Sequence, residues 1–201
     1  ENWPHFHPGI GYTTDADRIA LAAQSLSRSE FERAYGNRRT ATRRRLIPAE
    51  IWTATEATPE QLALPEPGQW TLAYDVSFNR DAAAIVGAWK LPDGRTVTRV
   101  LERRPGYSWL PAAVTDWNAR GRPAQIVADD GGAAREVTPL IAHPVRTLGG
   151  RAFAAATGNY LNRLESGEIL HDVDAIYSTA AEVAATRLVS DSPVFTRRHS
   201  A

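Results

Sequence analysis

Two apolar stretches decide the fold: WTLAYDV at residues 70–76 and QIVA at residues 125–128, the second followed directly by Asp129. Both are typical of β-strands, because they are short, rich in apolar and β-branched or aromatic residues, and bounded by turn-forming residues. The second stretch is short and apolar, as strands buried inside a parallel sheet are. Each stretch ends close to an aspartate, Asp75 in the first and Asp129 after the second.

The segments between and after these stretches predict a mixed α/β sheet. Strands are expected at 82–90 and 96–103, with a hairpin turn at 92–95, helices at 108–120 and 131–142, and a fifth strand at 145–148. A right-handed crossover puts the fourth strand beside the first and parallel to it. The carboxyl ends of such neighbouring strands are where α/β sheets bind ligands. We therefore expect Asp75 and Asp129 to lie together at one edge of the sheet.

Two carboxylates at such an edge suit divalent metal ions. Two ions about 4 Å apart can stabilise the attacking and leaving oxygens when a phosphodiester is cleaved. Gly131 and Gly132 allow a tight turn after Asp129, and Asp130 is a candidate additional ligand. An alternative is that residues 129–131 only cap the next helix. Asp75 favours the metal site, because an aspartate inside an apolar strand is costly without a partner.

Composition limits the kind of site and protein. The chain has 201 residues, of which 43% are apolar, and a formal net charge of zero. It contains no cysteine, so disulfides and thiolate ligands are excluded and Mg²⁺ or Mn²⁺ is the expected ion. No apolar run approaches the roughly 18–20 residues that cross a bilayer, and no signal-like segment begins the chain. We expect no membrane partner.

The chain is expected to have two parts. Residues 1–54 predict a helical appendage, with one helix capped near Asp15 and a second at about 27–35. Residues 55–69 contain Pro59, Pro65, Pro67 and Gly68 and predict a linker. Residues 70–201 form the main domain, which is expected to close with helices at 153–164 and 173–188 and an extended segment at 193–198.

Basic side chains are candidates for phosphate contact. Lys90 is the only lysine, and the other basic residues are arginines, which suit bidentate phosphate binding. The candidates are Arg80, Arg103, Arg104, Arg197 and Arg198. Five arginines between 38 and 45 could also contact phosphates, or could pack on an acidic partner or on an ATPase domain, although such runs are usually solvated surfaces.

The motifs resemble those of the large terminase subunits of tailed bacteriophages. Residues 72–77 with 81–85 are similar to the first nuclease motif of that family, and residues 126–134 to the second. Residues 5–11 resemble the end of the terminase ATPase region, and residues 30–38 with 47–52 resemble the connector before the nuclease. Residues 158–171 and 195–198 are similar to the C-terminal part of the family.

The resemblance implies an RNase H-like nuclease that cuts concatemeric double-stranded viral DNA during packaging. It implies Asp75 and Asp129 as catalytic, metal-binding carboxylates, with a third acid expected just beyond Ala201. The implied partners are the portal protein, the small terminase subunit and the ATPase domain, in the host cell cytoplasm. The chain has no Walker A pattern, so we expect no ATP hydrolysis.

Two other functions fit parts of the sequence. A resolvase or transposase core would share the carboxylates but would not explain residues 1–52. A non-catalytic module that docks onto DNA or the portal would bind without metal-dependent cleavage.

Overall fold

A computed structural model describes residues 15–25, 31, 45–189 and 192–196. The chain divides into two compact units, residues 1–44 and 45–201. In the first unit, helix α1 spans Ala16–Ser25, and the Asp15 carboxylate accepts a hydrogen bond from the Arg18 amide, as the capping prediction requires. The predicted helix at 27–35 and the arginines at 38–44 lie outside the described residues, apart from Phe31.

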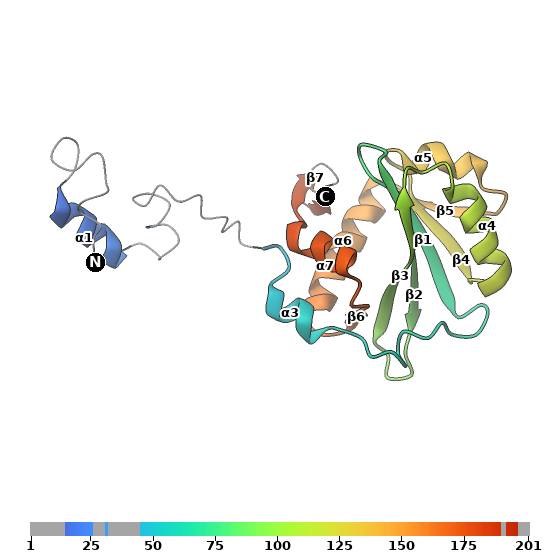
Figure 1. Cartoon of the computed structure of the whole chain (residues 1–201), viewed down its shortest axis with the longest axis horizontal. Coiled ribbons are helices and arrows are strands. Elements are labelled where there is room, and N and C mark those ends of the chain that lie inside the picture. The colour runs from blue at the N-terminus through green and yellow to red at the C-terminus, as the bar shows by residue number, and fades with distance from the viewer. Residues whose placement is uncertain (1–14, 26–30, 32–44, 190–191, 197–201) are drawn as a thin grey trace. The chain divides into compact units, whose positions relative to one another are not determined.

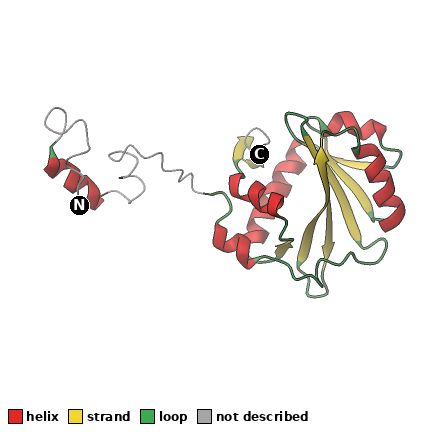
Figure 2. Ribbon diagram, viewed as in Figure 1, coloured by secondary structure: helices red, strands yellow, loops and turns green. Residues whose placement is uncertain are grey.

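The second unit is a mixed α/β fold built on one six-stranded sheet (Figures 1 and 2). Its strands are β1 (Trp70–Val76), β2 (Ala82–Lys90), β3 (Thr96–Pro105), β4 (Gln125–Asp129), β5 (Val145–Leu148) and β6 (Ile169–His171). Their order across the sheet is β5-β4-β1-β2-β3-β6. The β1–β2 and β2–β3 pairs are antiparallel, and β4 is parallel to both β1 and β5. The mixed α/β class and the parallel β1–β4 pair are confirmed.

Helices cover both faces of this sheet (Figure 1). They are α3 (Ala49–Ala54), α4 (Leu110–Gly121), α5 (Ala134–Val137), α6 (Gly150–Glu165) and α7 (Ala175–Val183), with a 3-10 turn η2 at Thr138–Leu140. Strand alternation points Leu72, Tyr74 and Val76 into a core shared with Leu110 and Val114 of α4. None of the described helices is long and apolar enough to cross a membrane.

The sheet has six strands rather than the predicted five. The additional strand, β6, pairs in parallel with β3, from Thr96 opposite Ile169 to Thr98 opposite His171. Three residues are too few to show a two-residue periodicity, so only the pairing with the exposed edge of β3 makes this segment a strand.

The C-terminal helix prediction at 173–188 was wrong beyond Val183. Strand β7 (Thr186–Val189) follows and pairs antiparallel with β8 (Ser192–Phe195), which confirms part of the extended segment predicted at 193–198. Pairing of Thr186 with Phe195 overrides the helix propensity of the alanine-rich run. The helix predicted at 131–142 is also interrupted, because Pro139 cannot continue an α-helix and lies in η2.

Residues 45–69 pack onto the main domain. The Trp52 ring stacks on His171 with ring centroids 3.5 Å apart, and the Ala57 amide donates to the His171 carbonyl at 2.8 Å. The compact unit therefore begins at Arg45, whereas the sequence placed residues 1–54 in an appendage and 55–69 in a linker.

Candidate functional site

Asp75 and Asp129 end adjacent parallel strands. Tyr74 lies opposite Ala128 in the register of β1 and β4, so Asp75 and Asp129 are the next residues along each strand. Tyr74 and Ala128 are buried, and strand alternation turns both aspartates to the other face of the sheet. Neighbouring strands lie about 4.8 Å apart. The two carboxylates thus start from neighbouring positions on one face, and Asp75 is exposed while Asp129 is partly buried.

The backbone after Asp129 makes room for its carboxylate. A Cβ atom added to Gly131 would lie 3.1 Å from Asp129 Oδ2, and Gly132 has a positive φ of 62°. The Asp130 amide donates to the Leu148 carbonyl at 3.0 Å, which ties this turn to β5. A side chain at Gly131 would therefore crowd the carboxylate.

Neither Asp129 nor Asp130 is the N-cap residue of the helix that follows. The N-cap of α5 is Ala133, whose side chain has no hydrogen-bond acceptor. The Asp130 carboxylate lies 3.9 Å from Arg135 Nε, in an exposed and therefore weak ion pair. Residues 129–131 thus lie before the N-cap of α5.

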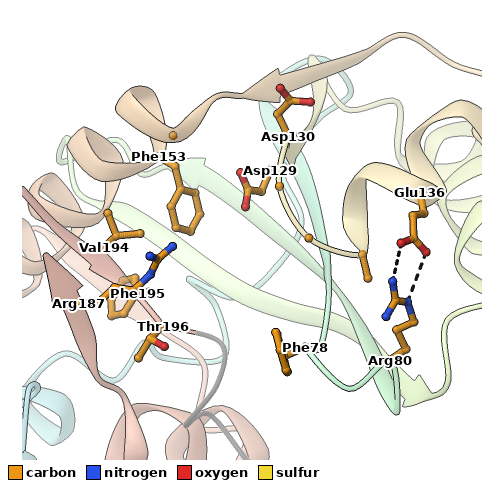
Figure 3. Close-up of a pocket in the computed structure, with 14 residues that line it drawn as sticks. Phe78, Arg80, Asp129, Asp130, Glu136, Phe153, Arg187, Val194, Phe195 and Thr196 are labelled. Atoms are coloured by element: carbon orange, nitrogen blue, oxygen red, sulfur yellow. Dashed lines mark hydrogen bonds and ion pairs between the residues drawn. The ribbon is translucent and has the colours of Figure 1, made fainter. Parts of the chain in front are cut away.

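A cavity of about 720 Å³ opens beside Asp129 (Figure 3). Its lining comes from the turn between β1 and β2, the loop from Asp129 to Ala133, the start of α6, and the β7–β8 hairpin. Asp129, Asp130 and Arg80 are lining residues that the sequence singled out. Asp75 is not among the described residues that line the cavity.

Arg80 is engaged by Glu136 at the rim of the cavity. Arg80 Nη2 lies 2.5 Å from Glu136 Oε1, and Nε lies 3.4 Å from Oε2 (Figure 3). Hydrogen bonding in this pair raises the pKa of Arg80 and lowers the pKa of Glu136. The pair ties the β1–β2 turn, where Arg80 has a φ of 61°, to α5.

Arg103 and Arg104, which are neighbours on β3, lie on opposite faces of the sheet. Ala84 of β2 lies opposite both Asp75 and Arg103, so these three residues form one row and share one face of the sheet. Arg104 belongs to the next row, with Ala83 and Val76 on the α4 face. It pairs with Glu102 and lies 5.1 Å from the Trp109 ring centroid. Arg197 and Arg198 lie outside the described residues.

The donor set fits a hard cation in part. Asp75 and Asp129 supply carboxylate oxygens on one sheet face, and Asp130 follows on the same loop, which suits Mg²⁺ or Mn²⁺. Within the described residues there is no group of three or more histidine, cysteine, aspartate or glutamate side chains placed to hold a metal.

The lining residues that the sequence did not predict include Phe78, Glu136, Phe153, Arg187 and Phe195. Phe153 and Arg187 were treated as helical positions, and Phe195 only as part of an extended segment. Phe78 lies two residues after the end of the first strand, close to Asp75 in sequence, and that position was the one available signal.

The sequence matches no family model and no curated protein. The fold is similar to that of the HK97 bacteriophage large terminase, with a TM-score of 0.62, 14% identity, and coverage of 96% of this chain and 49% of that one. It is also similar to the large terminase nuclease from thermophilic phage G20c with bound cobalt, with a TM-score of 0.50, 15% identity, and coverage of 63% and 70%. The chain thus spans about half the length of the HK97 protein, and its mixed α/β fold is similar to the fold of these structures.

Proposed function

We propose that this chain is the nuclease part, with the preceding connector, of a large terminase subunit of a tailed phage. Its function is metal-dependent cleavage of concatemeric double-stranded viral DNA during packaging. The observation that carries this proposal is the placement of Asp75 and Asp129 on one sheet face at the ends of adjacent parallel strands. The shared fold with the HK97 large terminase supports it.

Asp75 and Asp129 are the proposed ligands of two Mg²⁺ or Mn²⁺ ions, with Asp130 as an additional ligand. The bound cobalt in the G20c nuclease supports divalent-metal use in this fold. Bound by these carboxylates, the ions would supply activation of water and stabilisation of the leaving 3′ oxygen. The role of the protein is to hold the carboxylates rigidly on paired strands and to position the substrate.

Arg103 is the best-placed of the proposed DNA contacts. It shares a row with Asp75 and lies two strands away, or about 10 Å at the usual strand spacing. In the described part of the chain it has no ion-pair partner. A phosphate bound by Arg103 would hold the DNA backbone along the face that carries the carboxylates.

The proposed setting is the packaging motor in the host cytoplasm. The proposed partners are double-stranded DNA, the portal protein, the small terminase subunit and the ATPase domain. These proposed partners depend on the proposed terminase function.

Plasmid cleavage with Mn²⁺ tests the function. We expect Asp129→Asn and Asp75→Asn each to reduce nicking at least about 100-fold, because a lost ligand removes several kcal/mol of charge stabilisation in the transition state. The matched control is Asp116→Asn, which changes an exposed aspartate of α4 paired with Arg120. Chelation by EDTA should abolish the nicking of the unmodified protein. Cleavage by the Asp129 and Asp75 variants at the unmodified rate would overturn the proposal.

A non-catalytic docking module is the second candidate. It is favoured by the absence of a three-residue ligand group among the described residues. Calorimetry with Mn²⁺ separates the two functions: heat of ion binding that is lost in Asp75→Asn supports the nuclease, and no such heat supports docking.

A further inference from the structure

One wall of the cavity beside Asp129 carries three large side chains. Phe153 lies in the first turn of α6, Arg187 lies on β7 and Phe195 lies on β8, and all three line the cavity (Figure 3). Phe78, at the turn after β1, is 52% exposed and also lines the cavity. The site thus combines aromatic surface with a cation next to an acidic edge.

Arg187 is the cation available to a ligand in this cavity. The described lining residues include two arginines, Arg80 and Arg187. Arg80 is held by Glu136 through two contacts, whereas Arg187 is exposed and has no ion-pair partner among the described residues. An exposed guanidinium that is not engaged in an ion pair within the described part of the chain suits bidentate contact with a phosphate.

A contact with one of two hydrogen-bonded tyrosines holds Phe195 of this wall in place. The Phe195 ring contacts Tyr160 edge to face, with centroids 6.0 Å apart and planes at 69°. The Tyr160 hydroxyl lies 3.1 Å from the Tyr177 hydroxyl. Burial raises the pKa of Tyr160 well above its usual value, so this hydroxyl stays neutral and hydrogen-bonded. A wall that is already ordered loses little entropy when a ligand binds.

The volume of the cavity indicates the size of the ligand that it can hold. About 720 Å³ lies within the roughly 300–1,000 Å³ of pockets that hold small molecules, so the cavity has room for one nucleotide. A base can stack on the aromatic side chains of the cavity only after it leaves the base stack of the duplex. Stacking of a base on an aromatic side chain strengthens binding and tolerates any sequence.

We propose that this cavity is a subsite for one unpaired nucleotide of the substrate strand. Arg187 binds its phosphate, and Phe153 and Phe195 contact its base. The inference rests on the proposed nuclease function and deepens it: the preferred substrate is DNA that is locally unpaired beside the cleaved phosphate. Arg187 and the two phenylalanines are positioning residues and determine specificity.

Binding without cleavage tests the subsite. Fluorescence anisotropy in EDTA compares a 5′-labelled duplex with the same duplex that carries a two-nucleotide bulge. We expect the bulged DNA to bind about 10-fold more tightly, a difference of about 1.4 kcal/mol, because one of its bases stacks on the aromatic side chains. Repulsion by Asp75 and Asp129 acts on both DNAs and leaves the ratio unchanged. Arg187→Gln and Phe195→Leu should each lower the ratio to below about 3.

Two controls make the result specific to the cavity. Arg120→Gln removes an exposed arginine that pairs with Asp116 on α4, and the 10-fold ratio should remain. A 2-aminopurine in the bulge should change fluorescence with the unmodified protein and not with Phe195→Leu. Arg187 is exposed, so Arg187→Gln keeps the test valid if Phe195→Leu fails to fold.

The outcomes separate the subsite from the nuclease function. Equal binding of both DNAs, or an unchanged ratio in Arg187→Gln, would overturn the subsite even if Asp129→Asn abolishes plasmid cleavage. A bulge preference that depends on Arg187 would support the subsite even if the plasmid assay shows no cleavage.

Discussion

At Gly131, a single hydrogen atom in place of a side chain leaves room for the Asp129 carboxylate. The added methyl group of Gly131→Ala would lie 3.1 Å from Asp129 Oδ2, so the carboxylate or the loop must move. A displacement near 1 Å in an active site can reduce a rate about 100-fold. We expect plasmid nicking to fall by about 10-fold or more.

Gly150→Ala is the matched control for this change. Gly150 also lines the cavity, but a Cβ atom added there meets nothing within 4 Å. Nicking by this variant should stay within about twofold of the unmodified protein. If both variants cut equally well, close packing against Asp129 is not important for the site.

The Arg80–Glu136 pair makes a prediction about pH. Its hydrogen bond lowers the pKa of Glu136 below the usual 4.5 in the folded protein. A lowered pKa means that the pair stabilises the fold above the unfolded pKa and that this contribution is lost as the pH falls through the folded value. NMR titration should give a Glu136 midpoint below 4.5, and Arg80→Gln should move it towards 4.5. Identical midpoints in the two proteins would contradict the pairing.

At the scale of elements, the contact between α4 and β1 depends on Gly121. The Trp70 indole Nε1 donates to the Gly121 carbonyl at 2.8 Å, and a Cβ atom added to Gly121 would lie 2.5 Å from Trp70 Cζ2. Because Trp70 is buried, Gly121→Ala must shift the indole or the end of the helix. We expect a loss of about 1–3 kcal/mol in the free energy of unfolding, measured by urea denaturation.

Gly158→Ala tests whether this loss is specific to the contact. Gly158 lies inside α6, and a Cβ atom added there meets nothing within 4 Å. Alanine stabilises a helix interior by about 0.5–1 kcal/mol relative to glycine, so this variant should be as stable as the original or more so. A similar loss in both variants would show a general intolerance of larger residues instead.

At the scale of the whole molecule, the segment at 45–69 belongs to the stability of the main unit. Trp52 and Ile47 are buried with Leu164 and Ile169, and His171 contacts the Trp52 carbonyl through Nε2 at 2.7 Å. Burial of each large apolar side chain contributes about 1.5–3 kcal/mol. We therefore expect residues 45–201 to unfold at the same urea concentration as the whole chain, and residues 70–201 to be several kcal/mol less stable.

Trp52→Ala in the whole chain gives an independent measure. This change should cost about 3–5 kcal/mol, as expected for a buried tryptophan. If residues 70–201 were as stable as residues 45–201, the segment would be the linker that its prolines and Gly68 predicted.

The sequence by itself determined the long central strands and the position of the two aspartates. Strands β1, β2 and β5 have the predicted bounds. In β1 and β2, seven and nine residues are enough to show the alternation of a strand, and β5 is a short apolar run between turn-forming residues. The right-handed crossover then placed β4 beside β1, and with it Asp129 beside Asp75.

Only the tertiary structure decided β6, the β7–β8 hairpin and the cavity wall. Strands of three or four residues have no usable periodicity, and their state depends on a partner strand distant in sequence, as for β6 beside β3. For the same reason Arg187 and Phe195 could not be assigned to the site, because the hairpin and α6 bring them to Asp129. Local sequence patterns therefore determined the positions of the two carboxylates, and long-range packing determined which side chains surround them.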